Sequence, residues 1–220
     1  MNSHESDRSK DYLVTPEVGQ GPGILVLHSG RGLTKFTRQL CIRLAREGFV
    51  AHAPDLFHGK TPKTKGEALE AKASIDERSM INRLEDTAVF IRKHRGVSHN
   101  SIGVIGLGYG AENACRLAPS ITDTSSNIVL FYGYRETAWG DVDTPLLGHF
   151  AALDHEIPES RVNEIRSILT ANDVPHDLFE YPFTEPSFFE TDSTARHHPE
   201  AAQLAWERTL QFLKQTLLNY

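Results

Sequence analysis

Short apolar segments alternate with amphipathic helical segments along the chain, and this order constrains the fold more than any other feature. The segments typical of strands are 23–29, 49–53, 102–105, 128–132, 146–150 and 176–181. Apolar residues at helical spacing indicate helices over 36–47, 81–91, 112–117 and 159–172, and a last helix that begins at Pro199. This alternation predicts an α/β fold with a mostly parallel sheet and helices on both faces, in which sites form at the carboxyl ends of the strands.

The length and composition are those of one globular domain. A chain of 220 residues can bury a sizeable core, and 39% hydrophobic and 24% charged residues are ordinary values. We therefore expect a single domain over residues 1–220, with residues 1–12 as a flexible N-terminal segment. Because that polar segment has neither the apolar stretch of a secretion signal nor the length of a membrane span, we expect a cytoplasmic protein.

The charged, cysteine and histidine residues argue against several kinds of partner. The net charge of −6 comes without a run of Lys or Arg, so neither a nucleic acid nor a membrane surface is expected to bind. Cys41 and Cys115 fall in helical segments and are predicted to be buried free thiols. His197 and His198 lack the further ligands of a metal site, so no metal is expected. The oligomeric state is left open.

A glycine-rich turn separates the strand at 102–105 from the helix that follows it. The turn reads Gly106-Leu-Gly108-Tyr-Gly110, which is the spacing of a nucleophile elbow, where a strained turn lifts a reactive Ser or Cys above the sheet. Residue 108 is glycine, so it offers no hydroxyl or thiol to attack a carbonyl. Cys115 lies two helical turns further on, roughly 10 Å along the axis, which is too far to replace it.

The same glycines also fit a different motif. Gly106-x-Gly108-x-x-Ala111, after a strand and before a helix, matches the dinucleotide-binding fingerprint. That fingerprint requires an acidic residue at the end of the following strand, and the segment 128–133 ends without one. Dinucleotide binding is therefore the weaker interpretation, and we expect no cofactor.

Longer stretches of the chain resemble the dienelactone hydrolases, a family with the α/β-hydrolase fold. The similar stretches are 23–29, 44–56 and the helical segment Ala-Trp-Glu-Arg-Thr at 205–209. The resemblance spans most of residues 22–217. It implies an α/β-hydrolase fold and the hydrolysis of esters or lactones by Cys, His and Asp, without a cofactor.

The resemblance also implies which positions would form the catalytic triad. The acid position is Asp154, at the end of Pro-Leu-Leu-Gly-His-Phe-Ala-Ala-Leu-Asp, and it is kept. The nucleophile position is Gly108, and the histidine position is Pro186. A glutamate that the family carries just after its first core strand is matched by Ser29. We therefore expect that this chain does not form an acyl-enzyme at residue 108.

Other polar groups are expected around the same pocket. Gly30 and Tyr109 are expected to provide the backbone N–H groups of an oxyanion hole, because backbone donors survive the replacement of side chains. Ser29 and Tyr134 are expected to line the pocket. Ser29 would need a base within hydrogen-bond reach to act as a nucleophile, and the neighbouring His28 points to the opposite face of its strand.

No other histidine is a favoured base for Ser29. The remaining candidates, each expected at the surface, are His58, His155, His197 and His198. Two functions therefore remain. The first is an enzyme that acts on a carbonyl compound in a small-molecule pocket without a covalent step, as a cyclase, isomerase or water-mediated hydrolase. The second is a non-catalytic protein that binds a small molecule or a partner.

Overall fold

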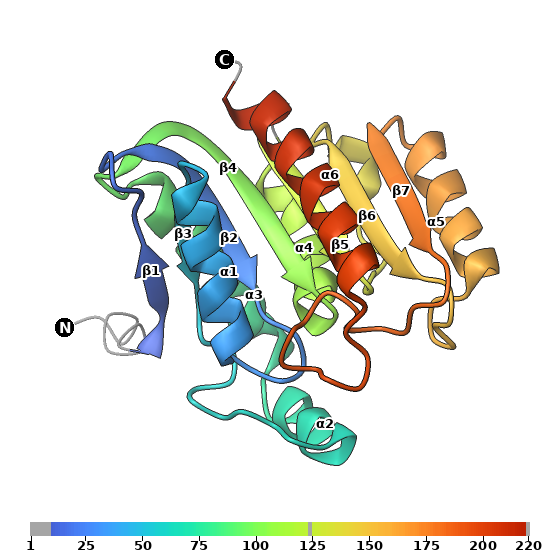
Figure 1. Ribbon diagram of the computed structural model, residues 1–220. Helices are drawn as coiled ribbons and strands as arrows, with labels where there is room; N and C mark the ends of the chain where they lie inside the picture. The colour runs from blue at the N-terminus through green and yellow to red at the C-terminus, as the bar shows by residue number, and fades with distance from the viewer. Residues whose placement is uncertain (1–9, 123–124, 219–220) are drawn as a thin grey trace.

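A seven-stranded sheet runs through the molecule in the order β1-β3-β2-β4-β5-β6-β7 (Figure 1). The computed structural model describes residues 10–122 and 125–218. The strands are β1 (Tyr12–Val14), β2 (Gly21–Leu27), β3 (Val50–Ala53), β4 (Val97–Leu107), β5 (Asn127–Phe131), β6 (Leu146–Ala151) and β7 (His176–Tyr181). Only β1 pairs antiparallel, with β3, and every other pair of neighbours is parallel. The prediction of a mostly parallel sheet is confirmed.

Helices cover both faces of the sheet, so both faces of the central strands are apolar. The helices are α1 (Lys35–Arg46), α2 (Lys65–Ala73), α3 (Glu77–Arg92), α4 (Tyr109–Leu117), α5 (Glu159–Ala171) and α6 (Pro199–Leu217). One core cluster packs α3, α4 and α5 against the sheet, and a second packs α1 and α6 against the opposite face. Figure 1 shows α1 and α6 in front of the sheet. Every residue of β2, β3, β5 and β6 is buried, as the apolar segments predict.

Helix α2 is absent from the expected order of elements, because it has no apolar stripe. Only Ala71 of this helix is buried. The helix is supported at its start instead, where the side chain of Thr64 accepts a hydrogen bond from the N–H of Glu67. Its position matters for the site described below, since α2 lies beyond the carboxyl ends of the parallel strands (Figure 1).

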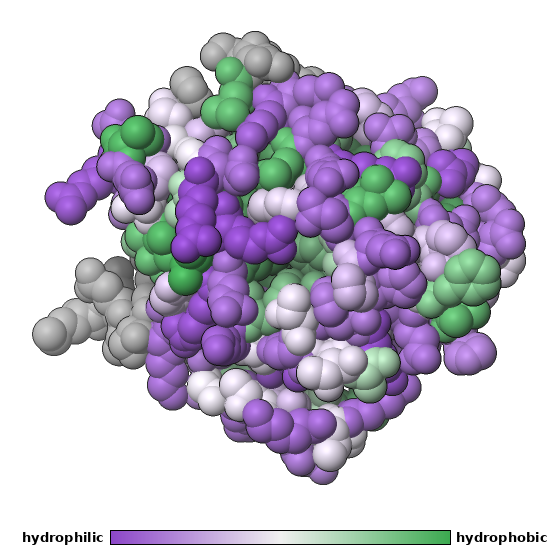
Figure 2. Space-filling view, viewed as in Figure 1, coloured by the Kyte–Doolittle hydropathy of each residue, from purple (hydrophilic) through white to green (hydrophobic). Residues whose placement is uncertain are grey.

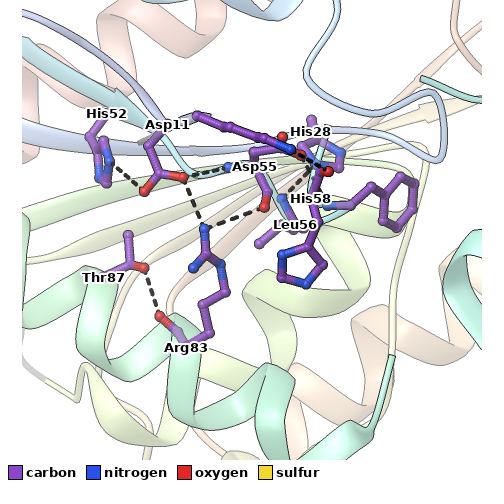
Figure 3. A network of polar contacts seen from close by, with 10 residues as sticks. Asp11, His28, His52, Asp55, Leu56, His58, Arg83 and Thr87 are labelled. Atoms are coloured by element: carbon purple, nitrogen blue, oxygen red, sulfur yellow. Dashed lines mark hydrogen bonds and ion pairs between the residues drawn. The ribbon is translucent and has the colours of Figure 1, made fainter. Parts of the chain in front are cut away.

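The residues just before β1 belong to the fold. The carboxylate of Asp11 accepts hydrogen bonds of 2.9 Å from Arg83 Nη2 and from the N–H of Asp55, and it lies 3.4 Å from His52 Nε2 (Figure 3). Burial alone would raise the pKa of Asp11, but the hydrogen bonds from His52 and Asp55 and the charge of Arg83 lower it below its usual value. The flexible segment that we expected over residues 1–12 therefore does not include Asp11 and Tyr12. Residues 1–9 lie outside the described residues.

The surface in front of α1 and α6 is mostly hydrophilic, with scattered hydrophobic side chains (Figure 2). None of the helices within residues 10–122 and 125–218 is both long enough and apolar enough to cross a bilayer. Cys41 and Cys115 are buried and free, as predicted. Burial raises the pKa of each thiol to about 12, so neither is a reactive thiolate.

Candidate functional site

The turn after β4 has the backbone of a nucleophile elbow. Strand β4 ends at Leu107, Gly108 has φ 51° and ψ −108°, and Tyr109 is the first residue of α4. The N–H of Gly108 donates to the carbonyl of Phe131 at 2.8 Å, which holds the turn against the end of β5. A residue with a side chain is strained at this φ, and such strain is typical of the turn that carries a nucleophile.

The glycine at position 108 is not required by a lack of space. A Cβ atom placed on Gly108 would lie 3.9 Å from Ser29 Cβ and 3.9 Å from Tyr132 Cδ2, which are ordinary contacts. A Cβ atom on Gly110, in contrast, would overlap the carbonyl of Leu27. Packing therefore demands glycine at 110, whereas a small side chain would fit above the turn at 108.

A buried carboxylate joins the two residues that border this space. Ser29 Oγ donates a hydrogen bond of 2.9 Å to Glu190 Oε2, and the hydroxyl of Tyr132 donates one of 2.9 Å to Glu190 Oε1. Glu190 is 1% exposed, and Ser29 and Tyr132 are each 6% exposed. We call these three residues the Glu190 cluster. They come from the ends of β2 and β5 and from the loop between β7 and α6.

Two aromatic side chains bring Glu190 into the molecule. Phe188 and Phe189 precede it and are buried in the same core cluster as α1 and α6. The ring of Phe189 stacks on Phe131 at 4.4 Å between centroids, and the ring of Phe188 meets Tyr132 at 5.7 Å. The loop therefore carries Glu190 as a fixed part of the core. Tyr132 itself has φ 37°, a backbone conformation that is uncommon for a residue with a side chain.

The surroundings of Glu190 favour its protonated form. Burial raises the pKa of the Glu190 carboxyl above its usual value, and the hydrogen bonds from Tyr132 and Ser29 oppose that rise. The charge of Asp192 raises the pKa further, and the guanidinium of Arg31 lowers it. Carboxyl groups with a raised pKa are often found at functional sites, where they act in proton transfer.

The loop after β2 forms the other border of the site. A Cβ atom on Gly30 would lie 3.6 Å from Ala68 Cβ and 3.7 Å from Lys72 Cε, so α2 packs directly over this loop. Arg31 Nη2 donates to the carbonyl of Asp192 at 2.8 Å and thereby links the loop to the segment after Glu190. The N–H of Tyr109 is at the start of α4, where helix N–H groups have no partner within the helix. This is the location expected for oxyanion donors.

Asp154 shapes its own turn. It is buried after β6, where its Oδ1 accepts a hydrogen bond of 2.8 Å from the N–H of Glu156, and its own N–H donates to the carbonyl of Ala151 at 3.2 Å. Residue 186, which the family resemblance relates to the histidine, is a half-buried proline. Asp154 therefore has no imidazole to orient from that position.

His28 is held away from the hydroxyl of Ser29. Its Nδ1 donates to the carbonyl of Ser29 at 2.8 Å, and its Nε2 accepts from the N–H of Leu56 at 3.0 Å. Figure 3 shows the ring turned toward Leu56. These two bonds require the neutral imidazole with its proton on Nδ1, and burial lowers the pKa of His28 accordingly.

The other histidines that we considered as bases also lie or bind outside the Glu190 cluster. His198 Nδ1 accepts from the N–H of Ala201 at the start of α6, and His197 Nδ1 donates to the carbonyl of Phe188. His58 and His155 are exposed. Among the described residues, no cluster of three or more His, Cys, Asp or Glu side chains could hold a metal ion.

Tyr134 lies next to a different part of the structure from the one that its sequence position suggests. Its hydroxyl accepts a hydrogen bond of 2.9 Å from Trp139 Nε1, and Arg161 lies over its ring at 5.8 Å. The tyrosine that contacts Glu190 is Tyr132. Sequence reasoning missed both Tyr132 and Glu190, and the only signal for Glu190 was the aromatic pair before it in an otherwise polar loop.

The strand order and the elbow define the class of protein, the α/β-hydrolase fold. A dienelactone hydrolase-like promiscuous phosphotriesterase from metagenomic libraries has this fold, with a TM-score of 0.81 at 18% identity over 94% of this chain and 92% of that one. The model of the dienelactone hydrolase family matches residues 10–217, and the chain belongs to that family of ester and lactone hydrolases.

Curated relatives match the chain over nearly its whole length. Protein usf from Aquifex pyrophilus is 28% identical over 217 residues, which cover 94% of each chain. A carboxymethylenebutenolidase from Rhodococcus opacus is 26% identical over 225 residues, which cover 94% of this chain and 86% of the relative.

Proposed function

We propose that this chain binds an ester, lactone or related carbonyl compound over Gly108 and acts on it without a covalent bond to residue 108. The observation that carries the proposal is the elbow itself, which keeps a φ of 51° at a residue that has no side chain. Membership of a family of ester and lactone hydrolases supports a carbonyl compound as the ligand.

The chemistry available at this turn is polarisation of a carbonyl group. The backbone N–H groups of Gly30 and Tyr109 would hold the carbonyl oxygen as negative charge develops on it, a contribution of about 3 kcal/mol for each donor in comparable sites. With Gly108 in the nucleophile position and Pro186 in the histidine position, attack and proton transfer by a Cys-His-Asp triad are both absent. Water-mediated hydrolysis, cyclisation and isomerisation require a polarised carbonyl and do not require such a triad.

A non-catalytic binding protein is the second candidate. It is favoured by the contacts of Asp154, whose Oδ1 is used by the N–H of Glu156 in a local turn. The same pocket would then hold a small molecule or a segment of a partner without changing it.

A panel of neutral aryl esters and lactones, assayed with the purified protein, separates the two candidates. Turnover that is lost in Ser29→Ala or Asp154→Ala, and kept in the exposed control His155→Ala, supports the enzyme. Flat progress curves at every pH, together with saturable binding of the same compounds, support the binding protein.

The double variant Gly108→Cys with Pro186→His tests the assignment of the two positions. It would add the thiol and the imidazole of the family triad to the retained Asp154, and we expect it to gain esterase activity and a burst of acyl-enzyme. Each single variant serves as the control, because a thiol without its base, or a base without its thiol, should gain much less. A double variant that folds but gains no esterase activity would show that the two positions are wrongly assigned.

A further inference from the structure

We propose that Glu190 is the proton carrier of this site and that the hydroxyl of Ser29 relays protons between Glu190 and the pocket. This inference rests on the proposed function and names the group that would move its protons. The inference is based on the Glu190 cluster, in which Ser29 and Tyr132 donate hydrogen bonds to opposite oxygens of one buried carboxylate.

The contacts of the three residues match the parts of a proton relay. Tyr132 holds Oε1 at 2.9 Å and fixes the plane of the carboxylate, so Oε2 faces Ser29 Oγ, also at 2.9 Å. Glu190 is 1% exposed, whereas the side chain of Ser29 borders the space above Gly108. Ser29 Oγ accepts a long hydrogen bond of 3.4 Å from the N–H of Arg31, and its second lone pair is the acceptor through which a proton from the pocket reaches Glu190.

The charges around Glu190 do not suit a purely structural role. The charge of Arg31 lowers the pKa of Glu190, but the Arg31 guanidinium donates to the carbonyl of Asp192 and lies 3.8 Å from the Asp192 carboxylate. A buried carboxylate that is held by two neutral hydroxyls is costly in its ionised form. A glutamine would accept from one of the two hydroxyls and donate to the other without that cost, and what a carboxyl group adds at this place is the ability to take up and release a proton.

The step is balanced for the hydrolysis of an ester or lactone. A water molecule attacks the carbonyl carbon and gives a proton to Ser29 Oγ, while the Ser29 proton passes to the Glu190 carboxylate. The carbonyl oxygen becomes an oxyanion near the N–H groups of Gly30 and Tyr109. When the bond between the carbonyl carbon and the alkoxy oxygen breaks, Glu190 returns the proton through Ser29 to the leaving alkoxide. Ser29 forms no bond to carbon.

The test compares Glu190→Gln with Glu185→Gln, a matched change at an exposed glutamate of the same loop. With a neutral aryl ester and a lactone as probes, we expect Glu190→Gln to lower kcat by about 100-fold with little change in KM, and Glu185→Gln to leave both unchanged. Tyr132→Phe should lower kcat less, because it loosens the carboxylate without removing it. In the wild type, kcat should fall on the acidic side of the pH profile as Glu190 becomes protonated, and this fall should be absent in Glu190→Gln. The neighbours that shift the pKa of Glu190 are Tyr132, Ser29, Asp192 and Arg31.

Two results would overturn the inference while the proposed function stands. The first is unchanged kcat and an unchanged pH profile in folded Glu190→Gln. The second is an acyl adduct on Ser29 in the intact mass of the protein during turnover, because Ser29 would then be a nucleophile. If the wild type shows no turnover, the proposed function fails, and infrared spectroscopy decides on Glu190. A protonated-carboxyl band that titrates in the wild type and is missing in Glu190→Gln supports a proton carrier, and the lack of such a band excludes it.

Discussion

Gly108 and Gly110 lie in the same turn for different physical reasons. Gly110 has the carbonyl of Leu27 where a Cβ atom would be, so the close packing of α4 against β2 excludes a side chain. Gly108 has room for a side chain, with its nearest neighbours at 3.9 Å, but its φ of 51° makes any other residue strained. Gly110 is required by close packing, whereas Gly108 only relieves backbone strain.

Alanine substitutions should separate these two reasons. Gly108→Ala should lower the free energy of unfolding by about 1–2 kcal/mol, because only backbone strain is added. Gly110→Ala should lower it by about 3 kcal/mol, because α4 has to move away from β2. Urea unfolding of the two variants measures the difference, and equal losses would contradict this account of the turn.

The residues of the candidate site differ in how far the sequence predicts them. Gly108, Asp154 and Ser29 follow strands directly, so their location at the carboxyl edge of the sheet comes from the order of elements. Glu190 contacts Ser29 across 161 residues of sequence. That contact depends on how a loop folds back on two aromatic anchors, and no periodic pattern encodes such a conformation.

Strand β1 shows how an element can form with little pattern in the sequence. Its three residues are too few to display an alternation, and its place at the edge of the sheet is secured by Asp11, just outside it. The carboxylate of Asp11 binds Arg83 of α3 and the loop after β3, so it ties the start of the fold to two other elements (Figure 3).

Removing the charge of Asp11 should therefore weaken the docking of β1. We expect Asp11→Asn to lower the free energy of unfolding by about 3 kcal/mol, since the mostly buried Arg83 would lose the charge that it pairs with at 2.9 Å. The loss should be smaller at low pH. Because the pKa of Asp11 is lowered in the fold, its contribution is present above the pKa of the unfolded chain and is lost as the pH falls through the folded value. Chemical unfolding at pH 7 and pH 3 measures both effects, with exposed Glu17→Gln as the control.

Most elements were predicted to within a few residues, and the exceptions have clear physical causes. The six parallel strands and five of the six helices have buried apolar residues at regular spacing, which is the signal that sequence patterns report. Strand β4 begins at Val97, well before the predicted start at 102, and it was missed there because most of its first residues are polar. Helix α2 and strand β1 bury too little apolar surface to produce a pattern.

The stability of the whole molecule should fall at mildly acidic pH, because it buries neutral imidazoles. His149 lies between the hydroxyls of Tyr181 at 2.8 Å and Thr209 at 3.0 Å, and burial, assisted by the charge of Arg208, lowers its pKa to about 3. The pKa of His28 is lowered by burial as well. The folded state therefore binds fewer protons than the unfolded state once the pH is below about 6.5.

Each of these two histidines should remove about 1.4 kcal/mol of stability per pH unit below that point, until its folded form also takes up a proton. Urea unfolding at a series of pH values between 7 and 4 measures the slope. His149→Gln should reduce the slope by one proton, with His155→Gln, at an exposed histidine, as the matched control variant. A slope that stays the same in His149→Gln would show that this imidazole does not titrate differently in the folded state.

The anchoring of Glu190 by Phe188 and Phe189 also bears on how such proteins diversify. The loop between the last strand and the last helix carries both Glu190 and the two rings, and those rings pack on Phe131 and Tyr132 at the end of β5. Transplanting this loop into a relative would bring Glu190 and its two rings, but the recipient would have to supply the surface on which the rings pack and the two hydroxyls. Exchanging this one loop and adjusting the side chains that meet it would therefore be enough to place a carboxyl group beside the turn, with the strand order unchanged.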